Sequence, residues 1–161
     1  GLGSMAVGSG ANLLAYTRGG LWQIDASGTW ALAMENAPPG GESSAVLAAA
    51  DGRLYLLGGE DTPTLYAYGA ESSLAWGISL TGVGGKAELA QYGGVLLLTT
   101  TFGNIIAVQA ESGALCNRTQ VYGDARAQLW HSLGSDGVLR VAVSEQILGL
   151  NWARFIGGCA A

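Results

Sequence analysis

Residues 51–58 read Asp-Gly-Arg-Leu-Tyr-Leu-Leu-Gly, a turn followed by a short apolar run, and this pattern recurs along the chain. Each equivalent run follows closely on a glycine, at Gly10, Gly52, Gly94 and Gly137. The intervals between these glycines are 42, 42 and 43 residues. A constant interval of this size is the signature of a repeat architecture. The chain therefore contains four copies of one structural unit.

A second landmark lies later in each repeat. Residues 70–76 read Ala-Glu-Ser-Ser-Leu-Ala-Trp and align with Ala-Glu-Ser-Gly-Ala-Leu-Cys at 110–116. The first repeat carries a degenerate form, Asp-Ala-Ser-Gly-Thr-Trp, at 25–30. Two landmarks in a constant order make a chance periodicity a poor explanation of the pattern.

The second repeat predicts four short strands, at residues 44–49, 53–57, 64–68 and 74–80. The pair Asp51-Gly52 suits a hairpin turn between the first two strands, because both residues tolerate positive φ. The run at 53–57 is apolar on both faces, which indicates a strand covered on both sides.

Four strands in a repeat of 40–45 residues are typical of a β-propeller blade. Stacked helical repeats would need amphipathic runs of 10–15 residues, and the one helix-friendly stretch, 86–92, is too short. We therefore predict an all-β fold, a single β-propeller domain over residues 1–161 with four blades of antiparallel strands. The approximate blades are 1–42, 43–84, 85–126 and 127–161.

The four blades can form a complete propeller in two ways. The four blades can form a small ring, locked by residues 1–9 adding a strand to the last blade. Alternatively, they are half of an eight-bladed propeller that a second chain completes. The sequence favours the closed ring, because the fourth repeat ends irregularly at 155–161.

The Ala-Glu-Ser-Gly/Ser turn before an aromatic residue resembles the tryptophan-docking turn of quinoprotein-like (PQQ-like) propeller repeats. The resemblance implies that Trp76 and Trp30 hold the docking position and pack the blades. The Leu57-Gly58-Gly59 segment, followed by Tyr68 and Trp76, is also similar to kelch repeats. Familiar quinoprotein-like propellers have about eight blades and bind PQQ with adjacent cysteines and calcium-binding acids. This sequence lacks adjacent cysteines and a recognisable set of acids, so we expect no cofactor and no metal.

The surface of this protein is short of charge. Charged residues make up 12% of the chain and hydrophobic residues 49%, with a net charge of −5. An acidic chain with one lysine, Lys86, has no basic patch for nucleic acid. Its apolar runs are far shorter than the roughly 20 residues that a membrane span needs. A surface with few charges favours association, so we expect a homo-oligomer or polymer.

No residue pattern predicts catalysis. The single histidine, His131, follows Trp130 and is expected to be a packed or surface residue rather than a base. The acidic pair Glu60-Asp61 lies in a predicted turn, where solvation explains it. The glycine-rich stretches 58–59 and 82–85 lack the Lys-Ser ending of a phosphate-binding loop. We therefore expect no catalytic residues.

Two cysteines, Cys116 and Cys159, each lie 22 residues after the first glycine of their repeats. At equivalent points of neighbouring blades they would be farther apart than the roughly 7 Å between Cα atoms that a disulfide allows. A bridge forms within the chain if Gly157-Gly158 redirects Cys159, or else between two chains. We predict a disulfide and hence an extracellular or cell-surface location. Asn117 opens an Asn-Arg-Thr glycosylation sequon.

These features predict a non-catalytic, extracellular structural protein that associates with its own copies, as a filament if head-to-tail contacts do not close. The alternative is a propeller scaffold that binds a peptide, protein or glycan partner.

Overall fold

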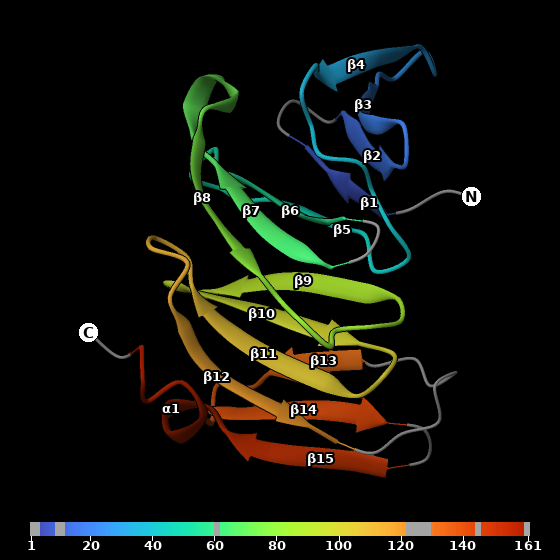
Figure 1. Cartoon of the computed structure of the whole chain (residues 1–161). Helices are drawn as coiled ribbons and strands as arrows, with labels where there is room; N and C mark the ends of the chain where they lie inside the picture. Colours follow the sequence, from blue (N-terminus) through green and yellow to red (C-terminus); the bar gives the residue numbers. More distant parts are fainter. Residues whose placement is uncertain (1–3, 9–11, 60–61, 122–129, 144–145, 160–161) are drawn as a thin grey trace. The chain divides into compact units, whose positions relative to one another are not determined.

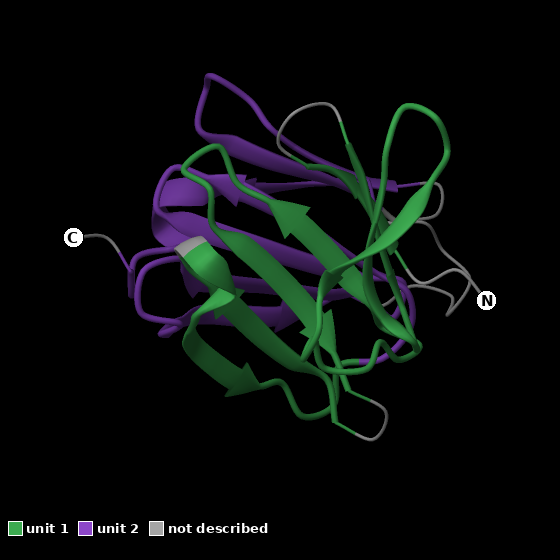
Figure 2. Ribbon diagram, turned by 90° about the horizontal axis from the view of Figure 1, so that it is seen from above, with its two compact units in different colours: residues 1–83 green, residues 84–161 purple. Residues whose placement is uncertain are grey.

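The computed structural model describes residues 4–8, 12–59, 62–121, 130–143 and 146–159 (Figure 1). The described chain is all-β, with four antiparallel sheets in sequence order and a single short helix among the described residues. It forms two compact units, Gly1–Val83 (unit 1) and Gly84–Ala161 (unit 2), coloured separately in Figure 2. The acidic pair Glu60-Asp61 and residue Gly10 lie outside the described residues.

Unit 1 contains two sheets of four strands. Their strands follow the order of the chain, each pairing with the next. Sheet 1 comprises β1 (Ser4–Val7), β2 (Leu13–Thr17), β3 (Gly20–Ile24) and β4 (Trp30–Met34). Sheet 2 comprises β5 (Ala45–Ala48), β6 (Leu54–Gly58), β7 (Thr64–Tyr68) and β8 (Leu74–Ser79), with a 3-10 turn, η2 (Ala70–Ser72), before β8.

Unit 2 contains the other two sheets. Sheet 3 comprises β9 (Ala87–Tyr92), β10 (Val95–Thr100), β11 (Asn104–Gln109) and β12 (Leu115–Gln120). Sheet 4 comprises β13 (Trp130–Leu133), β14 (Val138–Val143) and β15 (Gln146–Asn151), followed by the helix α1 (Trp152–Phe155). In the described residues sheet 4 has three strands, and α1 follows where the other sheets have their fourth strand.

The predicted Asp-Gly turn is present and is repeated. Between β5 and β6, the Ala49 N–H donates to the carbonyl of Arg53 at 2.8 Å, and Gly52 has a φ of +85°. Between β13 and β14, the Gly134 N–H donates to the carbonyl of Val138 at 3.0 Å, with Gly137 at +73°. In both turns the aspartate side chain accepts the N–H two residues on, so the same local chemistry sets the same hairpin.

Each unit has its own hydrophobic core between its two sheets. The core of unit 1 contains Tyr16, Leu21, Met34, Val46, Leu56 and Tyr68. The core of unit 2 contains Val95, Leu97, Ile105, Ala107, Leu139, Val141 and Phe155. The second strands of sheets 2 and 3 are buried almost throughout, which agrees with the apolar character expected of the run at 53–57.

The N-terminal segment does not take the place that the sequence predicted. Residues Ser4–Val7 were expected to add a strand to the last blade, but they pair with β2 as the edge strand of sheet 1, from Ser4↔Tyr16 to Val7↔Leu13. The Gly8 N–H donates to the carbonyl of Asn12 at 2.8 Å, next to the last β1–β2 pair, Val7↔Leu13. Ala6 then packs against the core of unit 1.

Candidate functional site

One face of sheet 1 carries two cross-strand rows of apolar side chains. Directly paired residues of antiparallel strands lie on the same face of the sheet, as do residues two apart along a strand. The pairing therefore brings two rows together on one face, which we call the sheet 1 outer face. The rows are Val7, Leu13, Ile24 and Trp30, and Met5, Ala15, Trp22 and Leu32.

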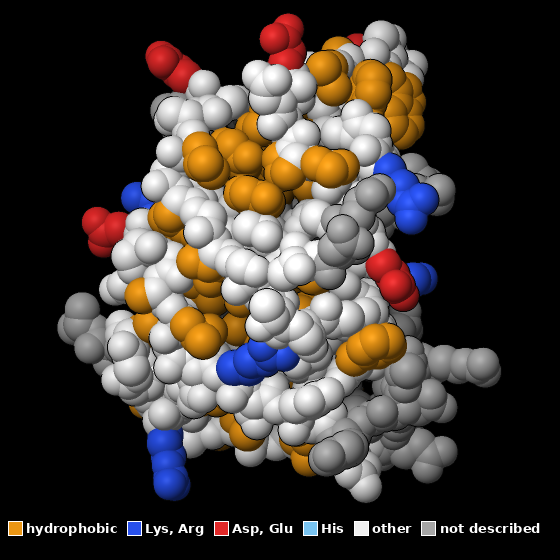
Figure 3. Space-filling view, viewed as in Figure 1, with side chains coloured by type: hydrophobic (Ala, Val, Ile, Leu, Met, Phe, Trp, Pro, Cys, Tyr) orange, Lys and Arg blue, Asp and Glu red, His pale blue; other side chains and the backbone are white. Residues whose placement is uncertain are grey.

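The margins of the sheet 1 outer face are exposed, whereas Ala15 within it is fully buried and Trp22 and Ile24 are half-buried. Val7 is 68% exposed, Met5 57% and Trp30 49%. The opposite face of the same sheet carries Tyr16 and Leu21, which are fully buried in the core of unit 1. Exposed apolar side chains in contiguous rows indicate an interaction surface, whereas single exposed side chains are ordinary. On the side drawn in Figure 3, hydrophobic side chains also lie over the start of β4.

Sheet 4 has a similar face. Trp130, Ala142 and Ile147 form one cross-strand row, and Ser132, Arg140 and Gly149 form the next. We call these six residues the sheet 4 outer face. Trp130 is 63% exposed and Ile147 74%, while Leu139 and Val141, on the other face of β14, are buried in the core of unit 2. Its single charge, Arg140, pairs with Asp136 at 2.5 Å.

The two tryptophans predicted to pack the blades lie in different environments. Trp76 is partly buried, opposite Ala67, and its ring lies 6.0 Å from that of Tyr55 in the same sheet. Trp30 pairs with Ile24 and is half exposed, and its role in packing the blades stays a prediction. Counted by strand pairing, Trp30 occupies the position of Leu74 rather than that of Trp76. A shift of one residue places a side chain on the opposite face of a strand.

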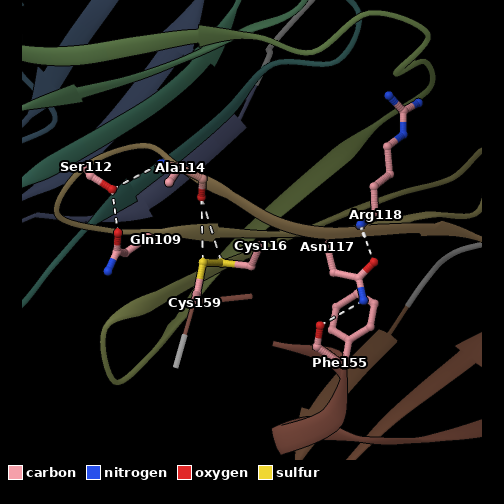
Figure 4. The surroundings of a disulfide bond; sticks show 8 residues. All are labelled: Gln109, Ser112, Ala114, Cys116, Asn117, Arg118, Phe155 and Cys159. Atoms are coloured by element: carbon pink, nitrogen blue, oxygen red, sulfur yellow. Dashed lines mark hydrogen bonds between the residues drawn. A yellow bond between two sulfur atoms is a disulfide. The ribbon is translucent and has the colours of Figure 1, made fainter. Parts of the chain in front are cut away.

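The predicted disulfide is formed within the chain, between Cys116 and Cys159, with Cα atoms 5.0 Å apart (Figure 4). The two cysteines are not at equivalent points of their repeats, because Cys116 lies in β12 whereas Cys159 follows α1. Gly158 allows the close approach, since a Cβ there would lie 2.9 Å from the Cys116 carbonyl oxygen. The bond fixes the C-terminal turn to sheet 3. A disulfide is typical of proteins outside the reducing cytosol.

Asn117, the residue of the glycosylation sequon, makes two structural contacts. Its side-chain Nδ2 donates to the carbonyl of Phe155 at 2.8 Å, and its Oδ1 accepts the N–H of Arg118 at 2.8 Å (Figure 4). The side chain is partly buried. Asn117 therefore holds the end of α1 beside the disulfide, and its glycosylation stays a prediction.

His131 is engaged in packing. Its Nδ1 lies 3.2 Å from the Thr99 hydroxyl, and its ring meets that of Tyr92 edge to face. Burial lowers the pKa of His131, against the opposing effect of Glu88. Thr99 is 1% exposed, so a substrate cannot reach this hydroxyl. Among the described residues, no group of three or more His, Cys, Asp or Glu side chains could hold a metal ion, and no helix could cross a membrane.

Comparison with known proteins identifies the fold but no relative by sequence. No protein-family model and no curated protein match the sequence. A protein of unknown function from Bacteroides caccae matches with a TM-score of 0.67 and 16% identity over 96% of this chain and 58% of its own. BamB from Moraxella catarrhalis matches with a TM-score of 0.59 and 16% identity, over 96% and 48%.

Apo AztD from Citrobacter koseri matches with a TM-score of 0.61 and 16% identity, over 96% of this chain and 45% of its own. The chain thus spans about half the length of the structures it matches. BamB and AztD are propeller proteins of the PQQ-like type. With the four antiparallel sheets, this likeness shows that the chain has a β-propeller fold.

Proposed function

We propose that this protein is a non-catalytic structural protein that acts outside the cytoplasm and associates with its own copies through the sheet 1 and sheet 4 outer faces. The observation that carries the proposal is the pair of exposed cross-strand apolar rows on sheet 1, which contain no charged residue. The disulfide supports a location outside the cytoplasm, at the cell surface or beyond it.

The packing of the four sheets suggests that a β-sheet of another copy would cover these two outer faces. In each unit one apolar sheet packs face to face against the next, and the central strands of sheets 2 and 3 are buried on both sides. The sheet 1 outer face and the apolar row Trp130, Ala142 and Ile147 of the sheet 4 outer face include exposed apolar side chains without such cover. A second copy offers the complementary face in each case.

A contact between sheet 1 of one copy and sheet 4 of another would cover one outer face of each copy. If sheet 1 of one copy packs against sheet 4 of the other, and the reverse, two identical contacts close a dimer. If the rotation between copies does not close, the same contact propagates as a filament. Because the chain spans about half the length of the solved propellers it matches, a closed pair would have the size of one of them.

The oligomeric state of the protein in solution tests the proposal. We expect sedimentation velocity at micromolar concentration to show a dimer or larger species. Val7→Lys and Ile147→Lys, one on each face, should each produce a monomer with unchanged circular dichroism. Leu74→Lys is the matched control, because Leu74 is 59% exposed but lies on neither face. A wild-type monomer, or an equal effect of Leu74→Lys, refutes the proposal.

A binding scaffold for a protein or glycan partner is the second candidate, because Trp22 and Trp30 lie on the same exposed face of sheet 1. Paired aromatic side chains suit sugar rings and protein contacts. If this candidate is correct, Trp22→Ala and Trp30→Ala should abolish binding to a glycan array while the size of the protein in solution stays the same. Loss of self-association without any glycan signal would favour the structural function.

A further inference from the structure

A cavity of about 250 Å³ lies within unit 1, between sheets 1 and 2. Leu14, Leu21 and Met34 of sheet 1 form one wall, and Ala48 and Leu54 of sheet 2 face them. In Figure 3, hydrophobic side chains gather between the positions that β8 and β4 have in Figure 1, where these two sheets meet. Concave, mostly apolar cavities with a few polar groups are the usual form of a small-molecule site.

Tyr68 supplies the first polar group of the cavity. It lines the cavity and is only 7% exposed. Its hydroxyl makes no hydrogen bond within the described part of the chain, whereas the hydroxyl of Tyr16, in the same core, donates to the carbonyl of Pro38 at 2.8 Å. Burial also raises the pKa of Tyr68, which keeps the hydroxyl neutral. The hydroxyl oxygen still reaches solvent, because the described residues contain no fully buried side-chain nitrogen or oxygen without a hydrogen-bond partner. It can therefore exchange a hydrogen bond with water for one with a ligand.

Gln23 supplies the second polar group. It lies on the cavity side of sheet 1, paired with Leu14, and its amide makes no hydrogen bond among the described residues. An amide can donate and accept, as can the Tyr68 hydroxyl. Both groups are neutral, as are the side chains of Asn12 and Ser72, which also line the cavity.

The charged residues at the cavity are of opposite sign and do not favour a charged ligand. Arg53 lies 3.7 Å from Asp51, with which it pairs. Glu71 contributes a carboxylate from the 3-10 turn, where Glu71 and Ser72 have φ of 59° and 58°. Such backbone conformations are strained in residues other than glycine and tend to occur at functional sites. Here both residues with these backbone conformations line the cavity.

We propose that this cavity binds a small uncharged molecule with a cyclic or branched apolar body and one amide or hydroxyl group. The apolar body fills the space between Leu14, Met34 and Leu54. The polar group exchanges hydrogen bonds with the Tyr68 hydroxyl and the Gln23 amide. Because the cavity is smaller than the roughly 300–1,000 Å³ of drug-sized sites, the ligand is of fragment size.

Three probes of one shape and different charge test the ligand class: benzamide, benzoate and benzylamine. Each is titrated into the full chain to millimolar concentration, and binding is followed by 1H–15N NMR. We expect saturable shifts with benzamide at the Gln23 side-chain amide and at the backbone of Tyr68. Binding of benzoate or benzylamine should be at least tenfold weaker, because an ion loses water on entering the cavity, Arg53 is already paired with Asp51, and the Glu71 carboxylate is exposed and screened by water.

Variants locate the binding. Tyr68→Phe should raise the benzamide dissociation constant about three- to tenfold, the range expected for one hydrogen bond. Tyr66→Phe is the matched control, since Tyr66 lies two residues away on the same face but does not line the cavity. Ala48→Leu should fill the cavity and remove binding while the protein stays folded. No saturable binding of benzamide, tighter binding of a charged probe, or an equal effect of Tyr66→Phe overturns the proposal.

Discussion

The hydroxyl of Tyr16 connects two segments of unit 1 that are 22 residues apart. It donates to the carbonyl of Pro38 at 2.8 Å, and its ring is fully buried in the core. Tyr16→Phe removes this bond and leaves a carbonyl without its partner, so we expect the free energy of unfolding to fall by about 1–2 kcal/mol. Urea denaturation at neutral pH measures the change. An unchanged unfolding midpoint would show that water replaces the hydroxyl at no cost.

Gly58 faces the same hydroxyl. A Cβ at this position would overlap the Tyr16 hydroxyl and lie 2.9 Å from the Pro39 carbonyl oxygen. Gly58→Ala should therefore destabilise the protein by about 1–3 kcal/mol through overpacking. Because the clash involves the Tyr16 hydroxyl, the Gly58→Ala, Tyr16→Phe double variant should lose less stability than the sum of the single variants. Additive losses in urea denaturation would mean that backbone displacement, not the hydroxyl, carries the effect.

His131 should make stability depend on pH, because burial lowers its pKa. The unfolded chain keeps the ordinary histidine pKa of about 6.5, so it binds a proton before the folded chain does as the pH falls. The free energy of unfolding should therefore decline as the pH falls through about 6.5 and continue to decline towards the lower folded pKa. His131→Gln, which can still bond to Thr99, should show a smaller decline between about pH 7 and pH 5. Equal slopes in the two proteins would contradict this assignment.

At the scale of elements, the sequence predicted the repeats well because hairpin chemistry is local. The Asp51-Gly52 turn and the doubly buried strand after it follow from side chains adjacent in the chain. The position of Trp30 could not be predicted in this way, because strand register depends on the hydrogen bonds across the turn. The Asp25 N–H bonds to the carbonyl of Thr29 and the Gly69 N–H to that of Ser73, so these two turns have the same span. Trp30 therefore follows its turn where Leu74 follows the other, and not at the position of Trp76.

Only part of the candidate site could be predicted from the sequence. The sequence does not single out the sheet 1 outer face, because residues 13–16 and 30–34 are apolar at successive positions and show no period-two alternation. The cavity could not be predicted, because Gln23 and Tyr68 come together only when two sheets pack. Equivalent repeat positions argued against a disulfide within the chain, and the bond forms because α1 removes that equivalence.

The disulfide should stabilise unit 2 by closing a loop between β12 and the turn after α1. The cysteines are 43 residues apart in sequence, for which chain entropy predicts a contribution of about 4 kcal/mol. Reduction, or the Cys116→Ser, Cys159→Ser double variant, should therefore lower the free energy of unfolding by about 2–5 kcal/mol. Denaturation with and without reductant measures this effect, and the double variant, which should not respond to reductant, is the control. If reductant destabilised the wild type and the double variant equally, the loss of stability would not come from the disulfide.

For the whole molecule, the scarcity of charge predicts how the proposed association responds to salt. Apolar contacts are not screened by ions, and the one charge on the two outer faces, Arg140, is already paired with Asp136. Raising sodium chloride from about 50 to about 500 mM should change the dissociation constant of the dimer less than about threefold. Sodium sulfate should strengthen the dimer, because sulfate favours the burial of apolar surface.

Sedimentation equilibrium across the two salt series tests this response. Ile147→Lys is the matched control, because a lysine on the sheet 4 outer face introduces a charge that must lose water on association. The variant should associate more weakly at every salt concentration. If sodium chloride instead weakened the wild-type dimer tenfold or more, charged surfaces would hold the copies together. The two apolar faces would then not be the interface.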